Sequence, residues 1–227
     1  MVILISPSKT FSKTNILGTT SLLFKDKQSE ILTKLKQLSK DEIKNIFKLS
    51  DSLTNEVYDY YQNSINNLAA IYLYEGILYK ALNPVELDFS NHDLYIISAL
   101  HGLVRPFDAI SKYRLDFQTT SLGNLYHYWE NDINNYFSLN HQNELIIDLT
   151  STEFSRLINK LPNVVRIEFI SDKRLSSVLL KQMRGYFANH IIKNNIQTLE
   201  EIKKIVINSF TYNDQESTDS IFVFDNN

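Results

Sequence analysis

Charged side chains of this chain gather beside turns and at the ends of apolar runs. The first group is ISPSKT at residues 5–10, where Lys9 follows the apolar run 2–5. An ammonium group supplies charge and the hydroxyls of Ser6 and Ser8 supply short hydrogen bonds, so this pattern suits a phosphate or carboxylate. It lacks the glycines of a P-loop, so it does not predict cleavage of a nucleoside triphosphate. An ordinary surface loop is the alternative.

Two arginines follow the apolar run at residues 95–100. Arg105 precedes Pro106, which stiffens the turn, and a stiff guanidinium loses less rotamer freedom when it holds an anion. Arg114 lies a little further on. The alternative is that both arginines form structural salt bridges, for which the nearby carboxylates are Asp108, Asp116 and Glu153.

Three more cations, Lys181, Arg184 and Lys193, lie on one expected helix at residues 181–194. Two kinds of anion fit the whole set, a DNA phosphate or a small ligand. In an enzyme, Asp116 or Glu153 would transfer the proton. Convergence on one enclosed pocket would favour an enzyme, whereas a line of cations along an open groove would favour DNA. The complete candidate set for anion binding is Ser6, Ser8, Lys9, Arg105, Arg114, Lys181, Arg184 and Lys193.

Composition excludes several kinds of site. The chain has no Cys, which rules out disulfides, thiolate nucleophiles and iron–sulfur clusters. Its five His form no HxH, HxxxH or HExxH pair, and no GxSxG motif occurs. We therefore expect no metal, no cofactor and no Ser/His/Asp catalysis.

Helices and strands are expected to alternate loosely along the chain. Apolar runs indicate strands at residues 2–5, 145–149 and 164–170, and an edge strand at 221–224. Helical periodicity indicates helices at 26–38, 39–49, 51–64 and 126–139. Capping boxes are expected for Ser39 with Glu42 and for Thr150 with Glu153. No linker or internal repeat interrupts the 227 residues, so we predict one α+β domain, residues 1–227, with a mixed sheet surrounded by helices.

Residues 68–82 predict two short helical pieces that are separated at Glu75-Gly76. Helix, tight turn and helix is the layout of a helix-hairpin-helix, in which turn amides meet a DNA phosphate without reading sequence. Leu78 stands where a second glycine is usual.

Charge is distributed unevenly. The net charge of −3 argues against nucleic-acid binding, but residues 1–48 and 173–204 each carry a net +5 on either side of an acidic middle. These two basic blocks would form a positive groove if the fold brought them together, and solvated helix faces are the alternative. The N-terminal stretch has no basic region before its short apolar run, and no stretch is long enough to span a membrane, so we expect a cytoplasmic protein.

Five stretches resemble the YaaA family of bacterial peroxide-stress proteins. They are ISPSKT, YIISALHGLVRPFDAISKYRLDF, YHYW, LTSTEF and KQMRGYFANHIIKNNI, in the family's order and over nearly the whole length. The resemblance implies the family's cantaloupe-like mixed fold, a helix-hairpin-helix element and binding to double-stranded or branched DNA without sequence specificity. It also implies a role in limiting iron-driven oxidative damage.

The residues that match the family's motifs are Lys9, Arg105-Pro106, Tyr113-Arg114-Leu115, Lys181, Arg184 and Gly185. The chain departs from the family at Gln182, which replaces a Lys, at Met183, which replaces an Ala, and at Ser209, where a glycine is usual. The lost Lys lowers the charge of the basic surface that the resemblance implies. The resemblance brings no catalytic assignment.

Overall fold

Parallel strands form the centre of the molecule. The computed structural model describes residues 1–226, and its sheet has the order β10-β11-β9-β8-β1-β5-β6. β1 lies between β5 on one side and β8 on the other, and both pairs are parallel. The two edge strands run antiparallel to their neighbours. The mixed sheet confirms the α+β prediction. The strands of this sheet are β1 (Val2–Ile5), β5 (Asp93–Ser98), β6 (Gly102–Val104), β8 (Ile146–Asp148), β9 (Val164–Ile170), β10 (Thr211–Tyr212) and β11 (Ile221–Asp225).

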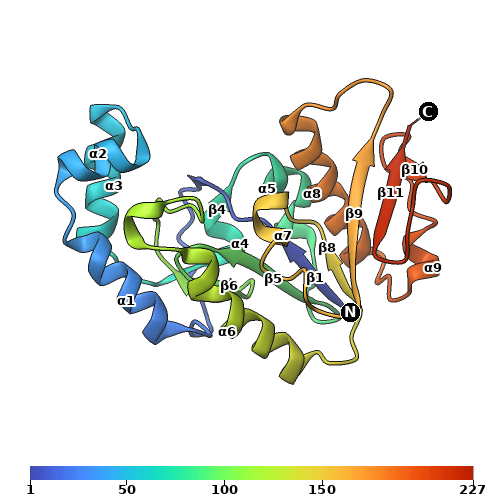
Figure 1. Cartoon of the computed structure of the whole chain (residues 1–227), viewed down its shortest axis with the longest axis horizontal. Coiled ribbons are helices and arrows are strands. Elements are labelled where there is room, and N and C mark those ends of the chain that lie inside the picture. Colours follow the sequence, from blue (N-terminus) through green and yellow to red (C-terminus); the bar gives the residue numbers. More distant parts are fainter. Residues whose placement is uncertain (227) are drawn as a thin grey trace.

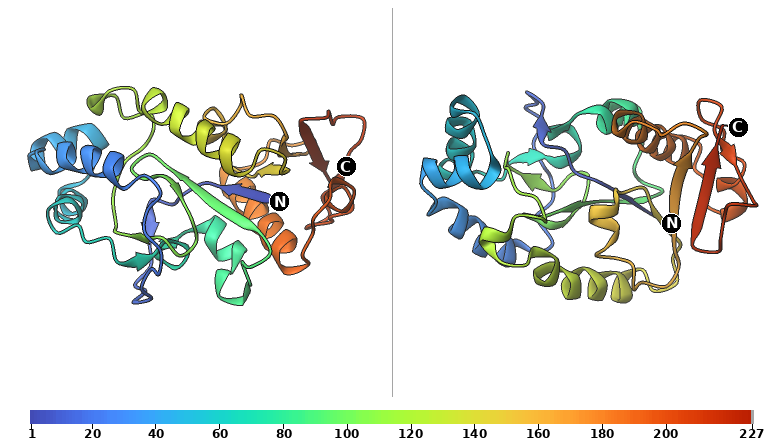
Figure 2. Two further views of the ribbon diagram at one scale, coloured as in Figure 1. Left: turned by 90° about the horizontal axis from the view of Figure 1, so that it is seen from below. Right: turned by 45° about the horizontal axis from the view of Figure 1, so that its top comes forward.

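Helices cover both faces of this sheet, which explains why its central strands are almost continuously apolar. All four residues of β1 are fully buried. α6 (Leu125–Asn140) lies on one face, whereas α5 (Ile77–Leu82) and α8 (Ser177–Lys193) lie on the other (Figures 1 and 2). Trp129 on α6 is fully buried and donates its indole N–H to the Ala99 carbonyl at 2.9 Å. Trp129 is therefore an anchor of the core.

Three N-terminal helices pack together at one end of the molecule (Figure 1). They are α1 (Lys25–Lys36), α2 (Lys40–Phe47) and α3 (Asp51–Gln62). Ser39 and Glu42 form the expected capping box of α2. The last short helix, α9 (Leu199–Ile202), has a capping box of Thr198 with Glu201. Two 3₁₀ turns lie at Pro84–Glu86 and Thr120–Leu122.

The segment expected to form a helix-hairpin-helix has extended residues between its helical pieces. α4 (Ala70–Leu73) leads into β4 (Tyr74–Glu75), which pairs antiparallel with β2 (Thr10–Phe11). Gly76, with φ 123°, then begins α5, which packs along α8. A helix-hairpin-helix element is therefore not shown. A second small sheet pairs β3 (Leu68–Ala69) with β7 (Ala109–Ile110).

Two local predictions were wrong. Residues 221–224 lie in β11, which is not an edge strand, because β10 covers its outer side. The helix after β8 is α7 (Thr152–Ser155), and its N-cap residue is Ser151. Thr150 does not cap it, because its hydroxyl donates to Asp148 Oδ1 at 2.6 Å. Within residues 1–226 no helix has the length and apolarity needed to cross a bilayer.

Candidate functional site

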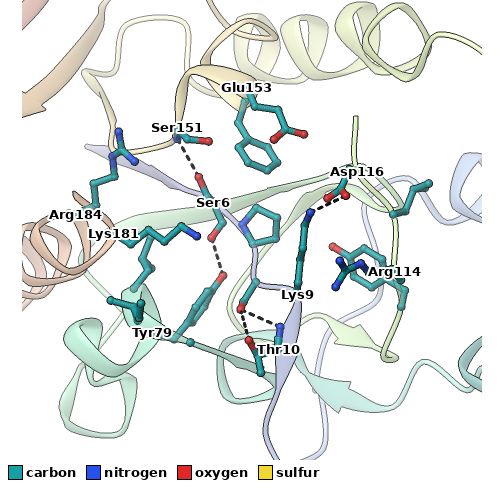
Figure 3. Close-up of a pocket in the computed structure, with 18 residues that line it drawn as sticks. Ser6, Lys9, Thr10, Tyr79, Arg114, Asp116, Ser151, Glu153, Lys181 and Arg184 are labelled. Carbon is teal, nitrogen blue, oxygen red and sulfur yellow. Dashed lines mark hydrogen bonds and ion pairs between the residues drawn. The ribbon is translucent and has the colours of Figure 1, made fainter. Parts of the chain in front are cut away.

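A pocket of about 390 Å³ lies beyond the carboxyl ends of β1 and β8. After β1 the chain goes on to β5, which lies on one side of β1, whereas the later strand β8 lies on the other side. The loops that leave the carboxyl ends of β1 and β8 therefore turn in different directions and leave a crevice between them. Ligands of open α/β sheets bind at such points. The walls come from the loop after β1, the start of α5, the segment at residues 113–116, α7 and α8 (Figure 3).

The loop after β1 is held by contacts at several points. Ser6 Oγ accepts from the Ser151 amide at 3.0 Å, and its carbonyl accepts from the Tyr79 hydroxyl at 3.1 Å. Ser8 Oγ accepts from the Thr10 amide at 3.1 Å. These bonds join the loop to α7 and α5, so the residues after β1 enter the pocket with a fixed backbone.

Lys9 crosses the pocket mouth to a carboxylate. Its Nζ donates to Asp116 Oδ2 at 2.7 Å, and its side chain is 57% exposed. An exposed pair of this kind contributes little to stability, roughly 0–1 kcal/mol. Its main effect is on the pocket, because it holds one ammonium and one carboxylate side by side at the entrance.

Two cations enter from α8. Lys181 and Arg184 are three residues apart and therefore share one face of the helix. Arg184 is half-buried, and its Nε is buried with no hydrogen-bond partner among the described residues. Burial lowers the pKa of its guanidinium, and the nearby charge of Arg166 acts in the same direction. Arg184 thus lines the cavity with a guanidinium group that is partly desolvated and not fully hydrogen-bonded by the described residues.

Arg114 enters from the opposite side (Figure 3). The Tyr61 hydroxyl donates to its backbone carbonyl, which fixes the main chain here. The Arg114 Nε is also buried without a hydrogen-bond partner within residues 1–226. A buried N–H group without a partner costs free energy, about 1–3 kcal/mol, unless a ligand supplies the acceptor.

Glu153 stands in the short helix α7 with its Oε1 buried and without a hydrogen-bond partner among the described residues. Burial raises the pKa of this carboxyl group, and the negative charge of Asp116 raises it further. Lys9 and the backbone of Phe117 act in the opposite direction. A carboxyl group whose pKa is moved towards neutrality is suited to taking up and releasing protons.

We expect Asp116→Asn to lower the pKa of the Glu153 carboxyl group. The substitution removes the charge that raises this pKa and releases Lys9, whose charge lowers it. Carbon-13 NMR titration of the glutamate carboxyl signals would measure the change. The exposed Asp219, replaced by Asn, is the control. A Glu153 pKa that is unchanged or higher in the Asp116 variant would contradict the assignment of this cause.

Most of the predicted site residues line this one pocket. The structure brings together Ser6, Ser8, Lys9, Gly76, Arg114, Asp116, Glu153, Lys181 and Arg184. Lys193 lies exposed at the end of α8, outside the lining. Glu75 also lies outside it, with Oε1 at 4.0 Å from the Nζ of Lys80.

Arg105 does not line this pocket. It forms a structural salt bridge with Asp108, which was the alternative to anion binding. Its Nη2 lies 2.8 Å from Asp108 Oδ1 and donates to the Ser21 carbonyl at 2.6 Å. Asp108 is fully buried, so the arginine neutralises a carboxylate that the fold has removed from water. Arg105 lines a separate cavity that also contains His92.

Several pocket residues were missed by sequence reasoning. Tyr79 and Phe154 are aromatic residues within apolar helical patterns, where packing is the usual explanation. The Ser151 backbone amide donates to Ser6 Oγ, and a backbone contact of this kind cannot be predicted from a pattern of side chains. Tyr113 was quoted only as part of a motif. It lines the pocket, and its hydroxyl bonds to Tyr74 at 2.8 Å and to Ser98 at 2.7 Å.

One group of possible metal ligands lies outside this pocket, at the amino ends of β5 and β8. It consists of Asp93, His141 and Glu144. Their donor atoms lie within 4.8 Å of one another. Both His141 ring nitrogens already have partners, Tyr95 at Nε2 and Glu144 at Nδ1, each at 2.9 Å. Glu144 also pairs with the N-terminal ammonium group at 3.2 Å. These contacts account for the cluster without an ion.

Comparison with known proteins places the chain in a family. The family model described as "Peroxide stress protein YaaA" matches residues 1–216. A UPF0246 protein of Fusobacterium nucleatum is 34% identical, over 99% of this chain and 98% of its own length. UPF0246 proteins of Finegoldia magna and Ligilactobacillus salivarius are 34% and 35% identical, over 99% of this chain and 97% and 99% of their own lengths. The chain therefore belongs to the peroxide stress protein YaaA family.

Proposed function

We propose that this member of a peroxide-stress family is a cytoplasmic enzyme that binds a small anionic ligand, such as a nucleotide, in the pocket beyond β1 and β8. Family membership supports a stress-related role. The observation that carries the proposal is the charge of the lining, which has four cations against two carboxylates. An excess of two positive charges in an enclosed space suits a dianionic group such as a phosphate monoester.

Hydrogen-bonding capacity supports the same ligand. Arg114 and Arg184 each have a buried Nε without a partner within the described residues. Guanidinium groups donate to phosphate oxygens in a fixed geometry, and their charge-assisted bonds are the stronger kind. Glu153 would transfer the proton, because its half-buried carboxyl group has a raised pKa and lies in the same cavity.

DNA binding without sequence specificity is the second candidate function. It is favoured by Lys9 and Lys181, which are both exposed at the pocket mouth. The wider groove of two basic blocks has less support, because α1 and α2 lie at the opposite end of the molecule from α8 (Figure 1). Among the cations of the first block, Lys9 lines the pocket together with Lys181 and Arg184 of the second block. A duplex would therefore meet a few cations and not a continuous basic surface.

We expect isothermal titration calorimetry to detect binding of inorganic phosphate and of a nucleoside monophosphate. Arg184→Gln should weaken this binding by about tenfold or more, because a charge-assisted hydrogen bond contributes roughly 1.5–3 kcal/mol. Lys193→Gln is the matched control, since it removes the same charge from the same helix outside the pocket. Absence of binding by the unmodified protein, or equal binding by the Arg184 variant, would contradict the proposal.

Fluorescence anisotropy with a labelled duplex separates the two candidates. DNA binding would weaken by about one log unit per log unit of salt for each phosphate neutralised. Binding at low salt that a nucleoside monophosphate does not displace would favour the DNA function over the enzyme.

A further inference from the structure

The charges of the pocket are segregated between two sides. Lys181 and Arg184 project from α8 on one side, and the remaining ionised groups lie towards the other (Figure 3). On that other side two cations and two carboxylates balance one another. These four are Lys9, Arg114, Asp116 and Glu153. The excess positive charge of the pocket is therefore concentrated at α8.

The carboxylate nearest the α8 cations does not cancel this excess. Asp148 at the end of β8 is fully buried, and its charge raises the pKa of the Arg184 guanidinium. Its oxygens accept from the Thr150 amide at 2.8 Å and from the hydroxyls of Thr150 and Ser155. Because these neutral donors already satisfy both oxygens, Arg184 makes no direct bond to Asp148 and keeps its N–H groups for a ligand.

The opposite side holds one acceptor that nothing in the pocket satisfies. Asp116 already receives the Lys9 ammonium at 2.7 Å. Glu153 also lines the pocket. The Phe117 backbone bonds to its carboxyl group, but its buried Oε1 has no hydrogen-bond donor and the carboxyl group has no salt-bridge partner within residues 1–226. A buried carboxylate oxygen without a donor is costly, so this position suits a ligand group that donates an N–H.

Apolar side chains also line the pocket. Ile77, Leu78 and Phe154 line the pocket together with the charged groups. These side chains can pack against a hydrocarbon linker or a ring but offer it no hydrogen bonds. A ligand that fills the pocket would therefore need an anionic group at α8, a hydrogen-bond donor at the opposite side and some apolar surface.

We propose that the ligand is bipolar, with a phosphate-like dianion held by Lys181 and Arg184 and an amine that donates to Glu153. This inference rests on the proposed anion-binding function and specifies its ligand class. It also gives the carboxyl group of Glu153 a definite proton to exchange, the one on the ligand nitrogen. A simple anion would fill only the α8 end.

The test uses pairs of probes that differ only in the amine. A series of ω-aminoalkyl phosphates of increasing chain length is compared by calorimetry with the alkyl phosphates of the same lengths. We expect the amine to increase affinity by about tenfold at the length that spans the pocket, the effect of one well-placed ion pair. Glu153→Gln should remove this preference, so that amino and alkyl phosphates of the same length bind alike. Arg184→Gln should weaken both probes alike, and exposed Glu216→Gln is the control.

The outcomes separate the inference from the function on which it rests. Equal affinity for amino and alkyl phosphates at every length would overturn the bipolar ligand and leave the anion pocket standing. A preference for the amine that survives in Glu153→Gln would overturn the role given to this carboxylate. If neither kind of phosphate binds the unmodified protein, the proposed anion-binding function itself fails.

Discussion

Replacing Gly185 by Ala should destabilise the protein, although the same change in an open helix would stabilise it by about 1 kcal/mol. The reason is the close contact between α8 and α5. A Cβ atom at residue 185 would lie 2.2 Å from the Leu78 carbonyl oxygen and 2.7 Å from the Ala81 Cβ. The first of these is a backbone atom that cannot rotate away. Overpacking of this kind costs roughly 1–3 kcal/mol, occasionally more, so the midpoint of urea denaturation should fall.

Variants on the same helices make the cause testable. Val178→Ala changes an exposed position of α8 and should leave the midpoint nearly unchanged. Adding Ala81→Gly to the Gly185 variant removes the second contact but leaves the first, and a glycine inside α5 itself costs about 1 kcal/mol, so stability should not be restored. A midpoint equal to or above that of the unmodified protein in Gly185→Ala would show that α8 can move away from α5 without cost.

The contact at Gly185 also explains why α8 can serve the pocket. Lys181 and Arg184 lie on the turn that precedes it, and the pocket wall opposite begins with Leu78 and Tyr79 of α5. Separating the two helices would move the cations away from the loop after β1. Gly185 lies within α8 and its φ is not positive, so its backbone conformation does not require a glycine. We infer that a glycine is needed at this position for the close packing of α8 on α5.

Many of the pocket residues could be predicted because short sequence patterns indicated them. Lys9 follows a buried strand within a hydroxyl-rich loop, and Lys181 and Arg184 share a helix face. Their convergence could not be predicted from spacing alone. It depends on β1 lying between β5 and β8. Strand order is set by contacts between distant parts of the chain, so no single segment of the sequence determines it.

The errors arose where two local readings were equally good. Arg105 beside a stiff turn reads as an anion clamp or as the partner of Asp108, and only burial of that carboxylate decides between them. Thr150 stands three residues before Glu153, as an N-cap would, but only two residues after Asp148. Asp148 is buried and lacks a cationic partner among the described residues, and it receives the Thr150 hydroxyl. In both cases the need to satisfy a buried carboxylate outweighed the local pattern.

The core contains a histidine that should make the protein sensitive to acid. His101 is fully buried, its ring packs edge-on against Tyr113, and neither ring nitrogen has a hydrogen-bond partner within residues 1–226. Burial alone lowers the pKa of this imidazole to about 3. The folded protein therefore keeps His101 neutral over a pH range in which the unfolded chain, with a pKa of about 6.5, binds a proton.

The sign of the effect follows from this difference in proton binding. Above pH 6.5 both states are neutral at His101 and the residue contributes nothing to the pH dependence. As the pH falls from 6.5 towards 3, the unfolded state binds the extra proton and the free energy of unfolding decreases by up to about 1.4 kcal/mol per pH unit. Between pH 6 and pH 4 the loss from this residue should be roughly 2–3 kcal/mol.

Substituting a leucine isolates this contribution from that of the carboxylates, which also titrate in this range. In His101→Leu the free energy of unfolding, measured by urea denaturation at several pH values, should fall less steeply between pH 6 and pH 4 than in the unmodified protein. His127→Leu is the matched control, because His127 is exposed on α6 and its loss should leave the slope unchanged. Parallel curves for the His101 variant and the unmodified protein would mean that the folded state can accommodate the imidazolium, by opening this part of the core to water. The unpaired ring nitrogens argue against that, since no acceptor among the described residues is in place to receive either N–H.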